Sequence, residues 1–152
     1  MGRVLTEAKI ENLGDLLMVQ RGLKPRDQVR GITVSDALVD TGSTTLALPI
    51  RLIQQLGLTK QFEKRATSTA GIRQVAVYEP VRLTIQGRDC TVDVMEVPEP
   101  VPVLIGQIPL EMMDLVIDLQ GRRLIGNPAH GGEHTLELYW QRAGSPVQKR
   151  SS

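Results

Sequence analysis

Hydrophobic and polar residues alternate with a period of two along most of the chain, a pattern typical of strands that bury one face. Within residues 4–10, the even-numbered positions from Val4 to Ile10 fall on one face and the odd-numbered positions on the other. Similar patterns predict strands or pieces of strand at 29–34, 37–39, 74–85, 91–97, 116–118, 123–125 and 136–140. Shorter apolar runs occupy 16–20, 46–48 and 104–106.

Helical spacing is confined to two short segments. Residues 50–56 place Ile50, Ile53 and Leu56 on one face, with Pro49 suited to the start and Gly57 to the left-handed stop. Residues 110–115 have room for one or two helical turns. The prolines within 97–103 favour an extended segment, because a residue before proline avoids the helical region. The whole pattern predicts an all-β domain with one or two short helices.

Composition and charge narrow the class of protein. At 152 residues, with 41% hydrophobic and 23% charged residues, the chain suits one globular domain, which we place at 1–140 with a disordered tail at 141–152. Aromatic residues make up only 3%, so the core must be aliphatic. The net charge is +1 and basic and acidic residues are mixed along the chain, so the sequence does not have the cluster of basic residues typical of proteins that bind nucleic acid. Without an apolar run of about 18 residues or a signal-peptide core, we expect no membrane association and a cytoplasmic location.

Candidate chemistry centres on Asp40, in the run Ala37-Leu-Val-Asp-Thr-Gly-Ser43. Two neighbouring carboxylates cannot both ionise, so such a pair shares one proton and can activate a water while polarising a peptide carbonyl. Gly42 would let its amide approach a carboxylate oxygen. Two other interpretations fit the run: a turn after a strand that Asp40 caps, or the phosphate loop of an actin-like ATPase or sugar kinase. The chain lacks the length and second motif that the phosphate-loop reading requires.

Three stretches carry a resemblance to a known family: 37–49, Ala70-Gly71 and Val103-Leu-Ile-Gly106. Together they resemble the retropepsin-like aspartic proteases, in particular their small prokaryotic relatives with one Asp-Thr-Gly per chain, over roughly residues 3–128. The resemblance implies a closed or partly open acid-protease barrel and an aspartic endopeptidase that acts as a homodimer on peptide or protein substrates. It implies no metal and no other cofactor. A non-catalytic dimer or peptide-binding module of the same fold is the alternative.

By the resemblance, Asp40 is the catalytic residue, and the flap runs over 66–77. Thr41 would interlock with Thr41 of the partner, and the Ser43 hydroxyl or amide would donate to the outer carboxylate oxygen. The residues expected to support the active-site loop are Thr41, Gly42, Ser43, Leu104, Ile105 and Gly106. Those expected to bind substrate or form the flap are Thr44, Thr45, Thr69, Ala70, Gly71 and Ile72.

The sequence also departs from the viral members of this family. Thr44 and Thr45 stand where acidic residues hold the substrate, Gln107 replaces an interface arginine, and Gly71 is the single flap glycine. Since the chain has one Asp-Thr-Gly, an active site requires two copies, and the segments 4–10 and 136–140 are candidate interface strands.

The run His130-Gly-Gly-Glu-His134 offers metal-ligating side chains. Its two glycines preclude a stable helix that would hold the rings together, so a solvated loop is the preferred interpretation.

Overall fold

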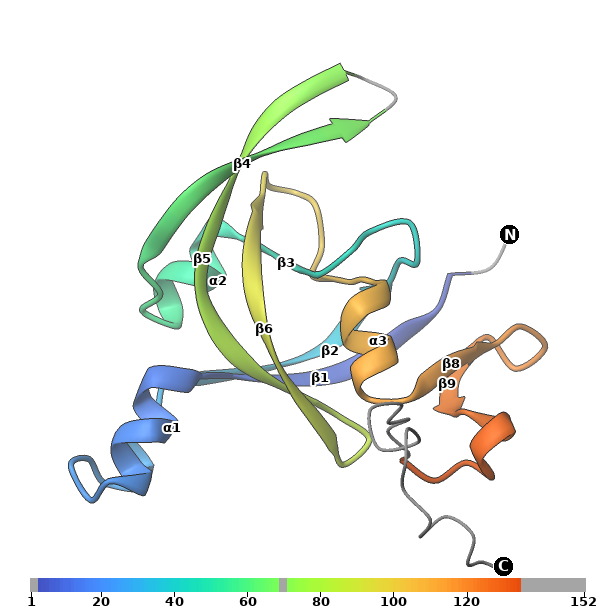
Figure 1. Cartoon of the computed structure of the whole chain (residues 1–152), viewed down its shortest axis with the longest axis horizontal. Coiled ribbons are helices and arrows are strands. Elements are labelled where there is room, and N and C mark those ends of the chain that lie inside the picture. The colour runs from blue at the N-terminus through green and yellow to red at the C-terminus, as the bar shows by residue number, and fades with distance from the viewer. Residues whose placement is uncertain (1–2, 69–70, 135–152) are drawn as a thin grey trace, which may run out of the picture.

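The computed structural model describes residues 3–68 and 71–134 (Figure 1). The described chain contains three α-helices: α1 (Leu13–Gln20), α2 (Ile50–Gln55) and α3 (Gln107–Met112). Two 3₁₀ helices are η1 (Arg26–Gln28) and η2 (Pro128–His130). The strands are β1 (Leu5–Asn12), β2 (Gly31–Val39), β3 (Leu46–Pro49), β4 (Lys60–Ser68), β5 (Gly71–Ile85), β6 (Arg88–Val97), β7 (Leu104–Ile105), β8 (Leu115–Asp118) and β9 (Arg123–Gly126).

Six strands close into a ring. The main sheet has the order β1-β2-β7-β3-β6-β5-β4, and an additional antiparallel pairing of β1 with β5 joins its two sides. Among the described strands, β4 pairs only with β5, and the two together extend as a long hairpin away from the ring (Figure 1). Strands β8 and β9 form a separate two-stranded sheet. The predicted fold class is confirmed: the molecule is mostly β with few short helices, although the described residues hold three α-helices.

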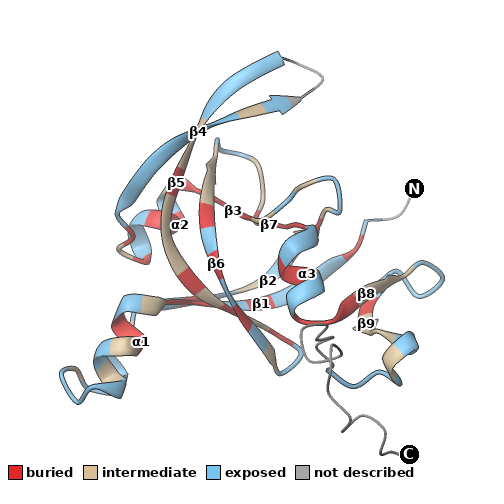
Figure 2. Ribbon diagram, in the orientation of Figure 1, coloured by how far each residue is buried: buried red, intermediate tan, exposed pale blue. Residues whose placement is uncertain are grey.

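The core inside the ring is aliphatic, as the low aromatic content predicted. The buried positions lie mainly on the ring strands and on the inner sides of α2 and α3 (Figure 2). The largest fully buried side chains are Ile10, Pro49, Leu46, Leu48, Ile53, Leu56, Val81, Leu83, Ile85, Val94, Ile105 and Met113. Removing this much apolar surface from water is the main source of stability that the sequence offers.

The first two strands follow the predicted alternation, with one correction. Val4, Ala8 and Ile10 are buried, and the odd-numbered positions 5, 7 and 9 are exposed. The two predicted strand pieces around Ser35 and Asp36 are a single strand, β2. The register of β2 against β1 shifts at this point, because Thr6 pairs with Ala37 and Ala8 pairs with Val34. Ser35 and Asp36 therefore form a bulge in β2 and do not interrupt the strand.

Helix α1 is a further correction, because the apolar run at 16–20 belongs to a helix that begins at Leu13. The Asn12 side chain caps it by accepting a hydrogen bond from the Asp15 N–H at 3.0 Å. Asp15 is itself buried and binds Arg30 through both carboxylate oxygens, at 2.8 and 2.9 Å, and the Lys24 ammonium at 2.7 Å. The side-chain hydrogen bonds from Arg30 hold the Asp15 pKa well below its ordinary value, although burial opposes them.

Local signals predicted α2 well, and the strands predicted at 74–85 and 91–97 form a hairpin, β5–β6. Helix α2 follows Pro49, and Gly57 after it has a φ of +69°. The β5–β6 hairpin turns at Gln86-Gly87, where both φ angles are positive, at +54° and +77°. That combination is a type I′ turn, whose twist matches antiparallel strands.

The connection from β6 to β7 is less extended than predicted. It contains a turn in which the Val101 N–H donates to the Pro98 carbonyl, and the Glu99–Pro100 peptide is cis. Helix α3 begins at Gln107, three residues before the predicted 110–115 segment. The predicted strand 136–140 and tail 141–152 lie outside the described residues.

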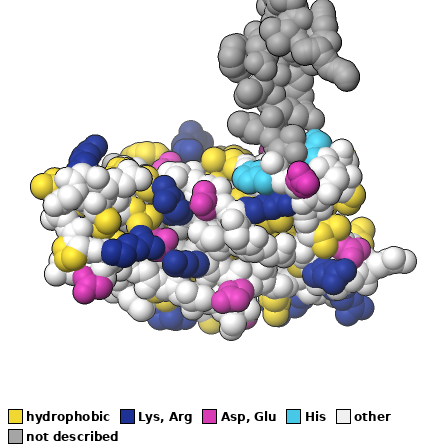
Figure 3. All heavy atoms as spheres, turned by 90° about the horizontal axis from the view of Figure 1, so that it is seen from below, with side chains coloured by type: hydrophobic (Ala, Val, Ile, Leu, Met, Phe, Trp, Pro, Cys, Tyr) yellow, Lys and Arg dark blue, Asp and Glu magenta, His cyan; other side chains and the backbone are white. Residues whose placement is uncertain are grey.

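The surface carries mixed charge. On the face shown in Figure 3, basic and acidic side chains are interspersed with hydrophobic ones, in keeping with the net charge of +1. No helix in the described part of the chain is long and apolar enough to cross a membrane.

Candidate active site

The loop after β2 owes its position to the short strand β7. This strand pairs in parallel with β2, with Val39 opposite Ile105, and antiparallel with β3, with Leu46 opposite Ile105. Strand β7 therefore lies between β2 and β3, and the segment 40–45 must cross its end to connect them. Crossing a buried strand fixes both ends of this loop within the core, so its backbone is well constrained.

Asp40 is anchored through both its backbone and its side chain. Its N–H donates to the Ile105 carbonyl at 2.9 Å, and its Oδ1 accepts a hydrogen bond from the Gly42 N–H at 3.0 Å. The side chain is half-buried, and within the described residues its second oxygen, Oδ2, accepts no hydrogen bond. The structure thus has a carboxylate with one oxygen fixed by an amide and the other available to a further group.

Gly106 allows the chain after β7 to press directly on this loop. A β-carbon at Gly106 would lie 2.6 Å from the Ser43 carbonyl oxygen and 2.7 Å from the carbonyl carbon of Thr44. Gly106 therefore makes a close backbone contact with the loop that a residue with a side chain could not make. Three main-chain hydrogen bonds of 2.9 Å each complete it: Gly106 N–H to the Thr45 carbonyl, Gln107 N–H to Ser43 and Ile108 N–H to Thr44.

The predicted supporting residues contact the loop in different ways. Leu104 and Ile105 form β7, and Ile105 is fully buried beneath Asp40. The Ser43 N–H donates to the Asp40 main-chain carbonyl at 3.0 Å, so its amide holds the turn rather than the outer carboxylate oxygen that we expected. Thr41 is exposed, and whether it meets a partner copy stays a prediction.

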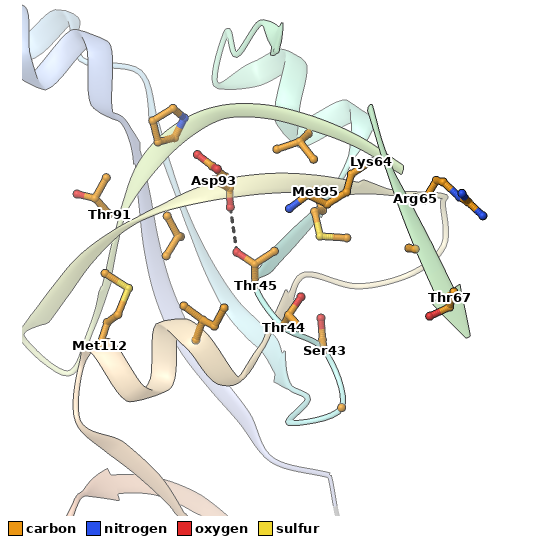
Figure 4. A pocket seen from close by; sticks show the side chains of 16 residues that line it. Ser43, Thr44, Thr45, Lys64, Arg65, Thr67, Thr91, Asp93, Met95 and Met112 are labelled. Atoms are coloured by element: carbon orange, nitrogen blue, oxygen red, sulfur yellow. Dashed lines mark hydrogen bonds between the residues drawn. The ribbon is translucent and has the colours of Figure 1, made fainter. Parts of the chain in front are cut away.

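A cleft of about 800 Å³ begins at this loop. Residues Gly42 to Thr45 form one wall, β4 overhangs it, β6 forms the floor and α3 closes the far end (Figure 4). The Thr45 hydroxyl donates to the Asp93 carbonyl at 3.2 Å and so ties the loop to the floor. Exposed Ile108 and Met112 give the α3 end an apolar lining.

The predicted substrate-binding residues fall into two groups. Thr44 and Thr45 line the cleft, and whether they bind substrate stays a prediction. In the flap, Thr69 and Ala70 lie outside the described residues, Gly71 has a φ of +119°, and Ile72 is 61% exposed. The sequence did not point to Lys64 and Arg65 on β4 or to Asp93 on β6, which also line the cleft. The alternation along β6 could have placed Asp93 on the exposed face of its strand, whereas no such alternation marks Lys64 and Arg65 on β4.

The histidine run does not form a metal centre within the described residues, where no group of three metal-ligating side chains gathers. His130 Nδ1 instead lies 2.8 Å from Asp114 Oδ2, and His134 Nε2 lies 3.0 Å from the Met112 carbonyl. Part of this run forms η2 rather than the plain loop that we expected.

The described residues thus form a ring of strands, in which an aspartate loop crosses the end of a central buried strand beside a hairpin-covered cleft. Residues 28–108 match the model of a family described as aspartyl protease, which is more than half of the 152-residue chain. The chain belongs to the aspartyl protease family. The matched region runs from before β2 to the start of α3 and so includes Asp40, the cleft floor and Gly106. No curated protein matches the sequence.

Proposed function

We propose that this protein is a retropepsin-type aspartic endopeptidase that works as a homodimer, each copy contributing one Asp40. In the active pair the ionised carboxylate removes a proton from a bound water, whose oxygen attacks the peptide carbonyl carbon. The protonated carboxyl donates a hydrogen bond to the carbonyl oxygen as negative charge develops there. Proton transfer to the amide nitrogen then lets the carbon–nitrogen bond break.

The observation that carries the proposal is the anchoring of Asp40. A carboxylate that must act with a second one has to be held in a fixed plane, and the Gly42 N–H and the Ile105 carbonyl fix its position through Oδ1 and the main chain. The exposed loop residues Thr41 and Gly42 leave room at this position for a second molecule.

The need for a dimer comes from the number of such motifs. The sequence has a single Asp-Thr-Gly, and a single carboxylate cannot supply an acid and a base at once. A two-fold axis through the neighbourhood of Asp40 would bring two identical carboxylates together, because a symmetric dimer pairs each residue near the axis with its own copy. The same operation would place two clefts end to end, which suits an extended peptide.

The direct test is Asp40→Asn, measured by cleavage of a fluorogenic peptide library. Removing one ionisable group from each half of the pair should reduce kcat/KM by at least about a thousandfold, because acid and base are lost together. Asp36→Asn is the matched control, since Asp36 is exposed on the neighbouring strand β2. Cleavage retained by Asp40→Asn would refute the proposal. Peptide binding without cleavage by the wild type would favour the non-catalytic module instead.

The pH profile gives a second test. Two carboxylates that share one proton are active only while that proton is held, so the rate should be highest at acidic to mildly acidic pH and fall towards neutrality and above. Steady-state kcat/KM measured from pH 3 to pH 9, with circular dichroism to confirm folding at each pH, would show this. A flat profile up to pH 9 is incompatible with a carboxylate pair.

A further inference from the structure

The cleft floor and its overhanging strand both present charged side chains. On β6, Cys90, Val92 and Val94 are buried, whereas the intervening residues Thr91 and Asp93 are exposed. Thr91, Asp93 and Met95 thus form one row along the floor of the cleft. In Figure 4 the row runs from Thr91, on the side of Met112, through Asp93 to Met95, on the side of Lys64.

Lys64 reaches into the cleft from above. It lies on β4, and in Figure 4 its side chain extends from that strand towards Met95 and the floor, whereas its neighbour Arg65 extends away. This difference follows from the alternation of side chains along a strand. Lys64 is therefore the basic residue of the hairpin that is placed to meet a bound peptide.

The Lys64 ammonium has little else to interact with. Among the described residues it forms no ion pair, and its Nζ lies 6.0 Å from the centroid of the Phe62 ring on the same strand. Lys60, on the same strand, differs because it pairs with Glu63 at 3.2 Å. An ammonium held over a cleft without a carboxylate partner gains free energy when a ligand brings one.

The charge of the surroundings decides which ligand is favoured. Of the charged residues along the described cleft, Lys64 faces the floor, Arg65 lies at the rim with its side chain pointing away, and Asp93 is the one acidic residue. Arg73 lies opposite Ala66 on β5 and adds a third positive charge to the same hairpin. Glu63, the acidic residue of β4, is paired with Lys60, so the part of the hairpin around Lys64, Arg65 and Arg73 is a positive region that attracts acidic side chains and repels basic ones.

We propose that Lys64 is a specificity-determining residue that selects peptides with an aspartate or glutamate at the position lying beneath β4. This inference rests on the proposed endopeptidase function and assigns a substrate class to its cleft. In an extended peptide successive side chains point in opposite directions. One side chain can therefore face Lys64 while its neighbours face the floor and the apolar end near Met112.

The test uses peptides of one core sequence with Glu, Gln or Lys placed in turn at each position. At one position the wild type should cleave the Glu peptide with a kcat/KM about tenfold above that of the isosteric Gln peptide. Lys64→Met should reduce this ratio to about one, and Lys64→Glu should invert it in favour of the Lys peptide. Lys60→Met, which removes a charge from the same strand outside the cleft, should keep the wild-type ratio.

Ratios within one variant cancel any general loss of activity, so the comparison holds even if Lys64→Met is a slower enzyme. A Glu-to-Gln ratio that is the same in wild type and Lys64→Met would overturn the inference. So would a preference for the Lys peptide that Asp93→Asn removes, because Asp93 would then be the selecting residue.

Binding separates this inference from the proposed function. Anisotropy measurements with labelled Glu and Gln peptides on Asp40→Asn should show the same ratio of affinities without chemistry. If the wild type cleaves no peptide but this ratio is present and depends on Lys64, charge selection holds and the endopeptidase proposal fails. If cleavage depends on Asp40 but neither ratio exceeds one, the endopeptidase holds and charge selection fails.

Discussion

Gly106→Ala probes the contact that holds the aspartate loop in place. The added β-carbon would lie 2.6 Å from the Ser43 carbonyl oxygen and 2.7 Å from the carbonyl carbons of Ser43 and Thr44. Carbon atoms in contact normally lie about 3.5–4.0 Å apart, so the loop or α3 must move by about 1 Å. All three atoms belong to the backbone, and no flexible side chain can absorb the movement.

The cost of that movement has two parts. Overpacking of a dense region costs about 1–3 kcal/mol. The three main-chain hydrogen bonds from residues 106–108 to the loop, each 2.9 Å long, would lengthen, and each contributes about 0.5–1.5 kcal/mol. We therefore expect a loss of about 2–4 kcal/mol in the free energy of unfolding. For a domain of this size that lowers Tm by roughly 5–12 °C.

Calorimetry and peptide cleavage should be measured on the same preparations. Activity below the Tm of the variant should fall as well, because a 1 Å displacement of Asp40 spoils its alignment with a partner carboxylate. Gly14→Ala is the matched control: its β-carbon would meet a single side-chain oxygen of Asn12 at 3.2 Å, and alanine favours the helix. A Gly106→Ala protein with unchanged Tm and activity would refute the packing that we describe.

Two further predictions concern groups away from the loop. Asp15→Asn should lower the free energy of unfolding at neutral pH by about 2–4 kcal/mol, because Arg30 and Lys24 would lose a buried carboxylate. The folded pKa of Asp15 lies below its unfolded value, so its stabilisation is complete above the ordinary carboxyl pKa and is lost as the pH falls below it. Urea titrations should show that the difference in the free energy of unfolding between wild type and variant becomes smaller below about pH 4. A difference that becomes larger there would contradict this prediction. Burial, with a smaller effect of Asp89, raises the pKa of Cys90 to about 11, so a thiol reagent at pH 8 should label Cys90 only as fast as the chain unfolds.

The features that the sequence predicted best depend on residues that are close in the sequence, or on a glycine at a position where two backbone segments are in close contact. The Gly42 amide does contact the Asp40 carboxylate, and Gly106 does meet the loop backbone. Pro49 and Gly57 frame α2 as predicted. In each case the residue type itself restricts the backbone or permits a close approach, so the pattern carries its own physical cause.

The features that it missed depend on pairing between distant segments. Strand β4 was not predicted because both of its faces are largely exposed, so no alternation of hydrophobic and polar residues marks it. Only its long pairing with β5 makes it a strand. The cleft positions of Lys64 and Asp93 were missed for the same reason, since they depend on how β4 lies over β6.

The central claim is that each active site needs Asp40 from two copies, and mixing chains tests it most directly. Wild type at a fixed concentration at which sedimentation shows dimers would be mixed with increasing Asp40→Asn chain. Because mixed dimers hold only one Asp40, an equal amount of variant should reduce the cleavage rate to about half and a threefold excess to about a quarter. An equal mass of an unrelated protein should leave the rate unchanged. A rate that does not respond to the Asp40→Asn chain would contradict the claim, because it would show that one copy contains a complete site.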